Sequence, residues 1–275
     1  MAFRTQYQHS VHQGAKEMLG AILGDVIGSV FEGSGLKITE FPLLSPKNIY
    51  TDDTVLTVAV ASAILDQGDY AGYFRKFGRR HPNRGYGGYF QRWLGDDSLG
   101  PYNSWGNGSA MRVCPVGWAF DSVEEVLGEA KRSADVTHNH PEGVRGAQAV
   151  ALSVYLARCG AKKIEIRQEI STRFGYDLTR TADEVRSVYS FDVSCQGSVP
   201  ESIICFLDSN DFESSVRLAI SLGGDADTMA CIAGGISEAY YGCLPKPAEL
   251  SVRELLPMDL LAVVDRFRAR FGCSS

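Results

Sequence analysis

Two short acidic segments carry the residue types best suited to binding a hard cation. The first is TDDT, at Thr51–Thr54, and it directly precedes an apolar stretch beginning at Val55. The second is GGDADT, at Gly223–Thr228, and it directly precedes the apolar stretch Met229–Tyr241. Asp and Thr are favoured helix N-caps, so capping alone would explain either segment. A cap uses one side-chain oxygen, whereas each segment offers two carboxylates and a hydroxyl, which favours a second role as metal ligands.

The chemistry of the donors restricts the kind of metal. Four carboxylates brought together would repel one another and lose charge unless a cation lay between them. The donors are hard oxygens, with no cysteine nearby and no metal-spaced histidine pair on a helix, which indicates Mg²⁺, Mn²⁺ or Ca²⁺ rather than zinc. Spacing along the chain does not bring the two segments together, so helix caps and a shared metal site both remain open at this point.

A glycine-rich apolar stretch precedes the first acidic segment. Its apolar residues have helical spacing over Lys16–Phe31, and Gly20, Gly24 and Gly28 recur every four residues within it. Each glycine costs a helix about 1 kcal/mol relative to alanine. Three of them on one stripe therefore predict that another backbone packs very close to this helix.

Helical patterns dominate the rest of the chain, and no sustained alternating pattern predicts a sheet. The nearest strand candidate, Ser187–Val193, is short, and glycine-rich irregular segments are expected at 78–108 and 192–200. We predict a polar N-terminal arm at residues 1–13 and one compact, mostly α-helical domain over 14–275. The expected helices are Asp53–Asp66, Glu142–Cys159, Lys163–Phe174, Asp211–Leu222, Asp227–Tyr241 and Pro257–Phe271.

Composition excludes several classes of protein. The chain has 275 residues, 44% of them hydrophobic, and a net charge of −6, which argues against nucleic acid as a partner. Its seven scattered cysteines, an odd number, suggest no disulfide framework. No segment is apolar and long enough to span a bilayer, and the polar N-terminus does not resemble a secretion signal. We expect a cytoplasmic monomer with no membrane partner.

Five blocks of sequence, in this order, resemble the ADP-ribosylglycohydrolase family. They are GDVIGSVFEG (24–33), YTDDT (50–54), GNGSAMR (106–112), THNHPEG (137–143) and GGDADTMACIAGGI (223–236). The TDDT block alone would be weak, whereas the five together are specific. The resemblance implies that 14–275 forms an all-α, orthogonal multi-helix domain with a dinuclear metal centre in a cleft.

The resemblance also assigns roles to individual residues. It implies that two divalent cations, Mg²⁺ or Mn²⁺, are bound by Thr51, Asp52, Asp53, Asp225, Asp227 and Thr228. Glu32 matches a glutamate that lies at the metal centre and can withdraw from it. The residues that match contacts to ADP-ribose are Gly106, Asn107, Gly108, Ser109 and His138. Tyr102 and Trp105 supply aromatic rings beside this loop, where adenine could stack.

The reaction that the resemblance implies is removal of mono-ADP-ribose from a modified protein, with ADP-ribose as the product. The bond cleaved is at C1 of the distal ribose, through an oxocarbenium-like state, and arginine is the expected acceptor. Glu32, Asp225 and Asp53 are the candidates for the catalytic base that activates water. Two alternatives remain: a dinuclear metal phosphoesterase, and a non-catalytic ADP-ribose-binding or crystallin-like structural protein.

Overall fold

The computed structural model describes residues 18–272, and the expected arm at 1–13 lies outside this range. Within the described residues every regular element is a helix, which confirms the all-α prediction, and the one β-bridge pairs Gly106 with Ser194. The helices are α1 (Leu19–Gly28), α2 (Asp52–Asp66), α3 (Tyr70–Arg80), α4 (Gly88–Gly95), α5 (Gly108–Met111), α6 (Cys114–Ala119), α7 (Val123–Asp135), α8 (Pro141–Arg158), α9 (Lys163–Phe174), α10 (Ala182–Val188), α11 (Cys195–Asp208), α12 (Phe212–Ser221), α13 (Ala226–Tyr241), α14 (Lys246–Leu255) and α15 (Met258–Phe271).

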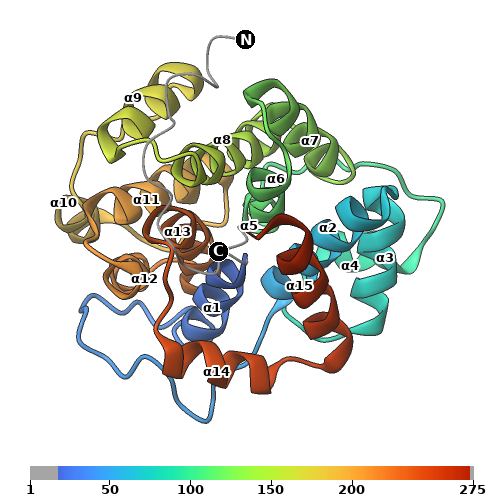
Figure 1. Ribbon diagram of the computed structural model, residues 1–275, viewed down its shortest axis with the longest axis horizontal. Coiled ribbons are helices and arrows are strands. Elements are labelled where there is room, and N and C mark those ends of the chain that lie inside the picture. Colours follow the sequence, from blue (N-terminus) through green and yellow to red (C-terminus); the bar gives the residue numbers. More distant parts are fainter. Residues whose placement is uncertain (1–17, 273–275) are drawn as a thin grey trace.

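Helices α1 and α13 lie at the centre of the molecule, and the remaining helices surround them (Figure 1). In that view α2, α3, α4 and α15 lie on one side and α9 to α12 on the other, with α7 and α8 above and α14 below. None of the helices within residues 18–272 is long and apolar enough to cross a membrane.

The glycine stripe of α1 packs directly on the backbone of α13, as the sequence predicts. A Cβ atom added at Gly24 would lie 2.0 Å from the carbonyl oxygen of Ala230, and one at Gly28 would lie 2.5 Å from that of Ala226. No larger side chain fits at such distances, because the interior is already close-packed. The contact brings the buried middle of α1 beside the N-terminus of α13, where the second acidic segment lies.

Helix α2 is largely enclosed by its neighbours, and every residue from Asp53 to Ala63 is buried. Thr51 is its N-cap and accepts a hydrogen bond from the backbone N–H of Asp53 at 3.2 Å. The packing of α2 therefore fixes the first acidic segment at a helix N-terminus, as predicted.

Two segments expected to be irregular contain helices. Helix α4 lies inside 78–108, and α11 begins at Cys195, inside 192–200, and continues through Pro200. Ser194 caps α11 by accepting a hydrogen bond from Gly197 N at 3.0 Å. Burial of the apolar residues that follow outweighs the backbone hydrogen bond that the proline cannot make.

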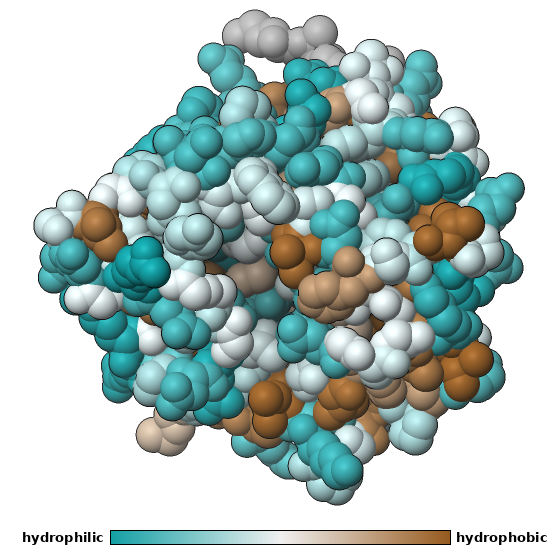
Figure 2. Space-filling model, turned by 180° about the vertical axis from the view of Figure 1, so that it is seen from behind, coloured by the Kyte–Doolittle hydropathy of each residue, from teal (hydrophilic) through white to brown (hydrophobic). Residues whose placement is uncertain are grey.

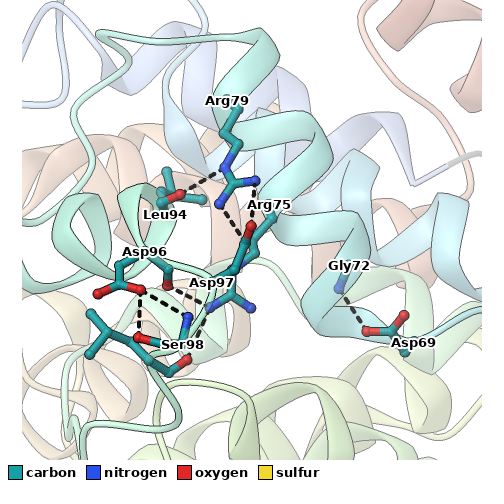
Figure 3. Close-up of polar contacts among 9 residues, drawn as sticks. Asp69, Gly72, Arg75, Arg79, Leu94, Asp96, Asp97 and Ser98 are labelled. Carbon is teal, nitrogen blue, oxygen red and sulfur yellow. Dashed lines mark hydrogen bonds and ion pairs between the residues drawn. The ribbon is translucent and has the colours of Figure 1, made fainter.

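The loop after α4 is held by cations of α3 (Figure 3). Arg79 donates through Nε to the carbonyl oxygen of Leu94 at 2.7 Å and pairs with Asp97 at 2.6 Å. Arg75 donates to the carbonyl oxygen of Leu99 at 3.0 Å. These contacts fix the chain just before it reaches the aromatic residues at 102–105. The face in Figure 2 is largely hydrophilic, with separate apolar patches and a hollow near its middle.

Candidate functional site

The two acidic segments meet at the N-termini of α2 and α13, which spacing along the chain could not establish. Carboxylate oxygens of Asp25, Asp53 and Asp227 all lie within 4.8 Å of one another. Those of Glu32, Asp225 and Asp227 form a second group within the same distance. Asp227 belongs to both groups, so the acidic residues form one continuous cluster around its carboxylate.

A hydroxyl group joins the two halves of this cluster. Thr228 of the second segment donates its hydroxyl proton to Asp53 Oδ2 of the first at 3.3 Å. Asp225, at the N-cap position of α13, makes no side-chain capping hydrogen bond. Capping therefore accounts for Thr51 but not for Asp225.

Asp25 is a member of the cluster that sequence reasoning did not select. It is fully buried in α1, and its Oδ1 accepts a hydrogen bond from the Thr51 hydroxyl at 2.7 Å. Its Oδ2 accepts from the backbone N–H groups of Thr51, at 3.0 Å, and Thr54, at 3.1 Å, and from the Thr54 hydroxyl. A charged residue in the middle of a buried glycine-rich helix was the available signal.

Burial and mutual repulsion disfavour the charged forms of these acids. Burial, followed by the charge of Asp227, raises the pKa of Asp25 to about 7. Burial, followed by the charge of Asp225, raises the pKa of Asp227 to about 8. The pKa values of Asp52 and Asp53 lie well above the ordinary range for the same reason. Without a counter-charge, the cluster therefore holds protons at neutral pH.

The donor set fits a divalent cation. Asp53 Oδ1 is buried and has no hydrogen-bond partner within residues 18–272. An orphaned carboxylate oxygen surrounded by other carboxylates is costly unless a cation satisfies it. Carboxylate and hydroxyl oxygens are the donors that Mg²⁺, Mn²⁺ and Ca²⁺ prefer.

Glu32 lies at the edge of the cluster rather than inside it. Its side chain is exposed, just beyond the C-terminus of α1. The charge of Asp227 raises the pKa of Glu32, and partial burial adds to that effect. Glu32 is thus the member of the cluster that solvent reaches most easily.

The cluster forms the floor of a cleft of about 720 Å³. Gly106, Asn107 and Gly108 line the cleft, and the Asn107 side-chain amide donates to Asp225 Oδ2 at 2.7 Å. Ser109, the next residue of this loop, is fully buried, and its hydroxyl donates to the carbonyl oxygen of Gly143 at 2.7 Å. The hydroxyl of Ser109 therefore holds the loop against α8.

A short backbone pairing holds the same loop from its other side. Asn107 N donates to the carbonyl oxygen of Val193 at 2.8 Å, and Cys195 N donates to that of Trp105 at 2.9 Å. The buried Cys195 thiol also donates to the carbonyl oxygen of Gly106, at 3.1 Å. Gly106–Gly108 is thus rigidly placed next to the acidic cluster.

His138 lines the cleft beside this loop. A Cβ atom added at Gly108 would lie 3.1 Å from His138 Nε2, and Nδ1 lies 2.7 Å from the Thr137 hydroxyl. Burial, followed by the charge of Arg112, lowers the pKa of His138 well below its ordinary value, so the imidazole is neutral. His140 lies apart from this role, since its Nδ1 accepts the N-capping hydrogen bond of α8 at 3.1 Å.

Aromatic side chains and one cation form the walls of the cleft. The rings of Tyr89 and Tyr102 stack with centroids 5.9 Å apart, and Trp105 is 48% exposed. The guanidinium of Arg84 lies over the ring of Tyr50 at 3.7 Å. Tyr89 and Arg84 were not expected from the sequence, because they belong to a segment without a recognised motif.

Sequence comparison finds relatives among ADP-ribosylhydrolases. ADP-ribosylhydrolase ARH3 of Danio rerio is 30% identical, and the match covers 82% of this chain and 81% of that protein. ARH3 of Mus musculus is 27% identical, with 89% and 88% covered. ADP-ribosylarginine hydrolase Tri1 of Pseudomonas putida (strain GB-1) is 27% identical, with 84% and 71% covered.

Fold comparison and a family model extend the match. A solved structure described as an ADP-ribosylglycohydrolase-related protein complex superposes with a TM-score of 0.67 at 24% identity. It covers 93% of this chain and 98% of its own, and the likeness establishes a shared fold. The family model described as ADP-ribosylglycohydrolase matches residues 14–273. The chain belongs to the ADP-ribosylglycohydrolase family of enzymes.

Proposed function

We propose that this enzyme removes mono-ADP-ribose from modified proteins by hydrolysing the bond at C1 of the distal ribose. The observation that carries the proposal is the position of Asp227, which joins two groups of carboxylates at the floor of a cleft. A cluster of this kind is suited to two divalent cations. Mg²⁺ and Mn²⁺ are the proposed cofactors, since both take hard oxygen donors.

The proposed metal ligands come from both ends of the cleft floor. They are Thr51, Asp52, Asp53, Asp225, Asp227 and Thr228. Because both oxygens of Asp25 accept hydrogen bonds from Thr51 and Thr54, we assign Asp25 the role of orienting the first acidic segment. Divalent cations bound there would supply positive charge and lower the pKa of a bound water toward neutrality.

The loop beside the cluster is the proposed site for the diphosphate and distal ribose. The backbone of Gly106–Gly108 lies against the cleft, and the Asn107 amide reaches from this loop to Asp225. The neutral His138 supplies a polar atom without adding charge. Tyr102 and Trp105 offer ring surfaces on which adenine could stack.

Glu32 is the proposed general base, ahead of Asp225 and Asp53. It borders the cluster, faces solvent and has a raised pKa, which suits a group that takes a proton from water near neutral pH. Asp225 already accepts the amide hydrogen bond of Asn107, and Asp53 is buried. A positioned base contributes about 10²- to 10⁴-fold, so Glu32→Gln should slow hydrolysis by that range while metal binding persists.

One chain supplies the whole proposed site. Its members run from Glu32 to Thr228, so we propose that 14–275 acts as a single catalytic domain and that the monomer is active. Arginine is the proposed acceptor, supported by the name of the relative Tri1, an ADP-ribosylarginine hydrolase.

Matched peptides test the proposal. One peptide carries ADP-ribosyl-arginine and the other ADP-ribosyl-serine, and each is incubated with Mg²⁺, Mn²⁺ or EDTA. We expect release of intact ADP-ribose from the arginine peptide, abolished by EDTA. Release only from the serine peptide would replace the acceptor assignment. AMP as the product would indicate a phosphoesterase, and no release from either peptide would refute a protein-directed hydrolase.

A further inference from the structure

The chain that follows Glu32 is a long irregular connection, residues 33–49, between α1 and α2. Figure 1 shows it in blue, running past α12 and α14. It contains no helix of its own, so contacts made by individual side chains must hold it in place. Because Glu32 lies where this connection begins, whatever holds the connection also sets the position of the Glu32 carboxylate.

Lys37 makes the most extensive of these contacts. Its ammonium donates to the carbonyl oxygens of Tyr189 at 2.6 Å, Leu222 at 2.5 Å and Arg186 at 3.2 Å. Tyr189 and Leu222 are the C-cap residues of α10 and α12. A cation at the carboxyl ends of two helices satisfies orphan carbonyls and interacts favourably with both helix dipoles.

The same stretch packs against the second acidic segment. Gly223 has a φ of +69°, and a Cβ atom added there would lie 3.0 Å from backbone atoms of Gly35 and Leu36 and from Cε of Lys37. Leu222, which accepts the lysine hydrogen bond, lies three residues before Asp225. Lys37 thus links the segment that contains Glu32 to the segment that contains Asp225.

A second cation secures the middle of the connection. Arg217 of α12 donates to the carbonyl oxygens of Phe41 at 2.7 Å and Thr39 at 3.0 Å, and its guanidinium lies 4.9 Å from the centroid of the Phe41 ring. That ring packs on Phe31 with centroids 4.6 Å apart, directly before Glu32. Lys37 and Arg217 therefore hold the connection at residues 37 and 39–41, and the Phe41 ring links it back to Phe31.

We propose that Lys37 is a positioning residue for Glu32: its ammonium binds three carbonyl groups and so holds the Glu32 carboxylate beside Asp225 and Asp227. The inference rests on the proposed function for its kinetic consequence. Its structural consequence needs no substrate. Without the ammonium, three carbonyl groups lose their donor, and the chain from Glu32 to Leu36 detaches from Gly223.

Lys37→Met tests this role, with Lys37→Arg as the conservative variant and Lys47→Met as the matched control. Lys47 lies in the same connection, and its ammonium makes no hydrogen bond to other described residues. Hydrogen exchange of residues 30–37 is the first readout. We expect faster exchange there in Lys37→Met, partial recovery in Lys37→Arg and no change in Lys47→Met. Unchanged exchange in Lys37→Met would overturn the proposal whatever the enzyme's substrate.

Kinetics on the ADP-ribosylated peptide provide the second readout. Displacing a catalytic group by about 1 Å can cost up to about 10²-fold, so we expect at least about a tenfold fall in kcat for Lys37→Met with KM little changed. In the Glu32→Gln background, Lys37→Met should cause almost no further loss, because the group it positions is already disabled. An equal loss in both backgrounds would mean that Lys37 acts without Glu32 and would overturn the assignment. If the parent enzyme releases no ADP-ribose, the proposed function fails, and hydrogen exchange alone decides the role of Lys37.

Discussion

Asp227→Asn removes the ionisable carboxyl group that both carboxylate groups of the cleft share. Asn has the shape of Asp and keeps an oxygen that can accept the hydrogen bond from Thr228 N, which measures 2.9 Å in the native site. The N-terminus of α13 should therefore remain capped. What changes is the repulsion among the buried acids and the number of charged donors offered to a cation.

The magnitude follows from the pKa of Asp227, which burial and Asp225 raise from 3.8 to about 8. An acid whose pKa is raised on folding stabilises the fold fully below its unfolded pKa, and this contribution is lost as pH rises through its folded pKa. The free energy of unfolding falls by about 1.4 kcal/mol for each pH unit between 3.8 and 7. The total at pH 7 is about 4 kcal/mol as an upper bound. Water entering the cleft screens part of this, so we expect Asp227→Asn to raise the metal-free stability at pH 7 by about 2 kcal/mol.

Thermal unfolding at pH 7 in the presence of a chelator measures this gain. A change of about 2 kcal/mol corresponds to a rise in Tm of about 4–8 °C for a chain of this size. The matched control is Asp135→Asn on the surface of α7, where loss of the pair with Lys131 should change stability by less than about 0.5 kcal/mol. Mn²⁺ at a hundredfold excess over Kd should then stabilise the native protein by about 2.7 kcal/mol, seen as a rise in Tm, and should stabilise Asp227→Asn far less.

The reasoning fails if the signs are reversed. A lower Tm for Asp227→Asn than for the native protein in chelator would mean that the Asp227 carboxylate is stabilised by its surroundings rather than repelled. An equal gain from Mn²⁺ in both proteins would mean that Asp227 is not shared between cations.

Two further predictions concern the same centre and the helices that build it. Burial raises the pKa of Asp25 to about 7 and that of Asp227 to about 8. At a pH below these pKa values, a cation must displace protons in order to bind. Calorimetric Mn²⁺ affinity should therefore rise by about tenfold or more per pH unit from 6 to 7 and level off above about 8.5, whereas a flat profile would contradict the assignment. Gly24→Ala places a methyl group 2.0 Å from the carbonyl oxygen of Ala230 and should destabilise the protein by about 3 kcal/mol or prevent folding. Gly128→Ala, which meets nothing within 4 Å in the middle of α7, should stabilise it by about 0.5–1 kcal/mol in urea unfolding; equal effects at both glycines would refute the close α1–α13 contact.

Local patterns predicted seven of the helices, among them α1, α2 and α13, which build the site. The bounds of α9 coincide with the predicted Lys163–Phe174, and the glycine stripe correctly indicated a close backbone contact. Helix α11 was not predicted, because Gly197 and Pro200 near its start are typical of irregular chain. Burial of its apolar face against other helices decides its conformation, and that burial is not visible in a local window.

The site was predictable in its parts but not in its assembly. Each acidic segment stands out by composition, whereas their convergence depends on the packing of α1, α2 and α13. Asp25 was missed because it has no acidic neighbour in the sequence and joins the cluster through the hydroxyls of Thr51 and Thr54. The direction of the Ser109 side chain likewise depends on a distant partner, the carbonyl group of Gly143.

Identification of the product in a metal-controlled reaction tests the central claim most directly. The metal-stripped protein is mixed with a peptide carrying ADP-ribosyl-arginine, and Mn²⁺ is added. The released nucleotide is then identified by mass spectrometry. We predict intact ADP-ribose and unmodified arginine peptide from the native protein, and no release from the Asp227→Asn variant or with chelator present. Release of AMP, or equal release of ADP-ribose with and without chelator, would contradict the account.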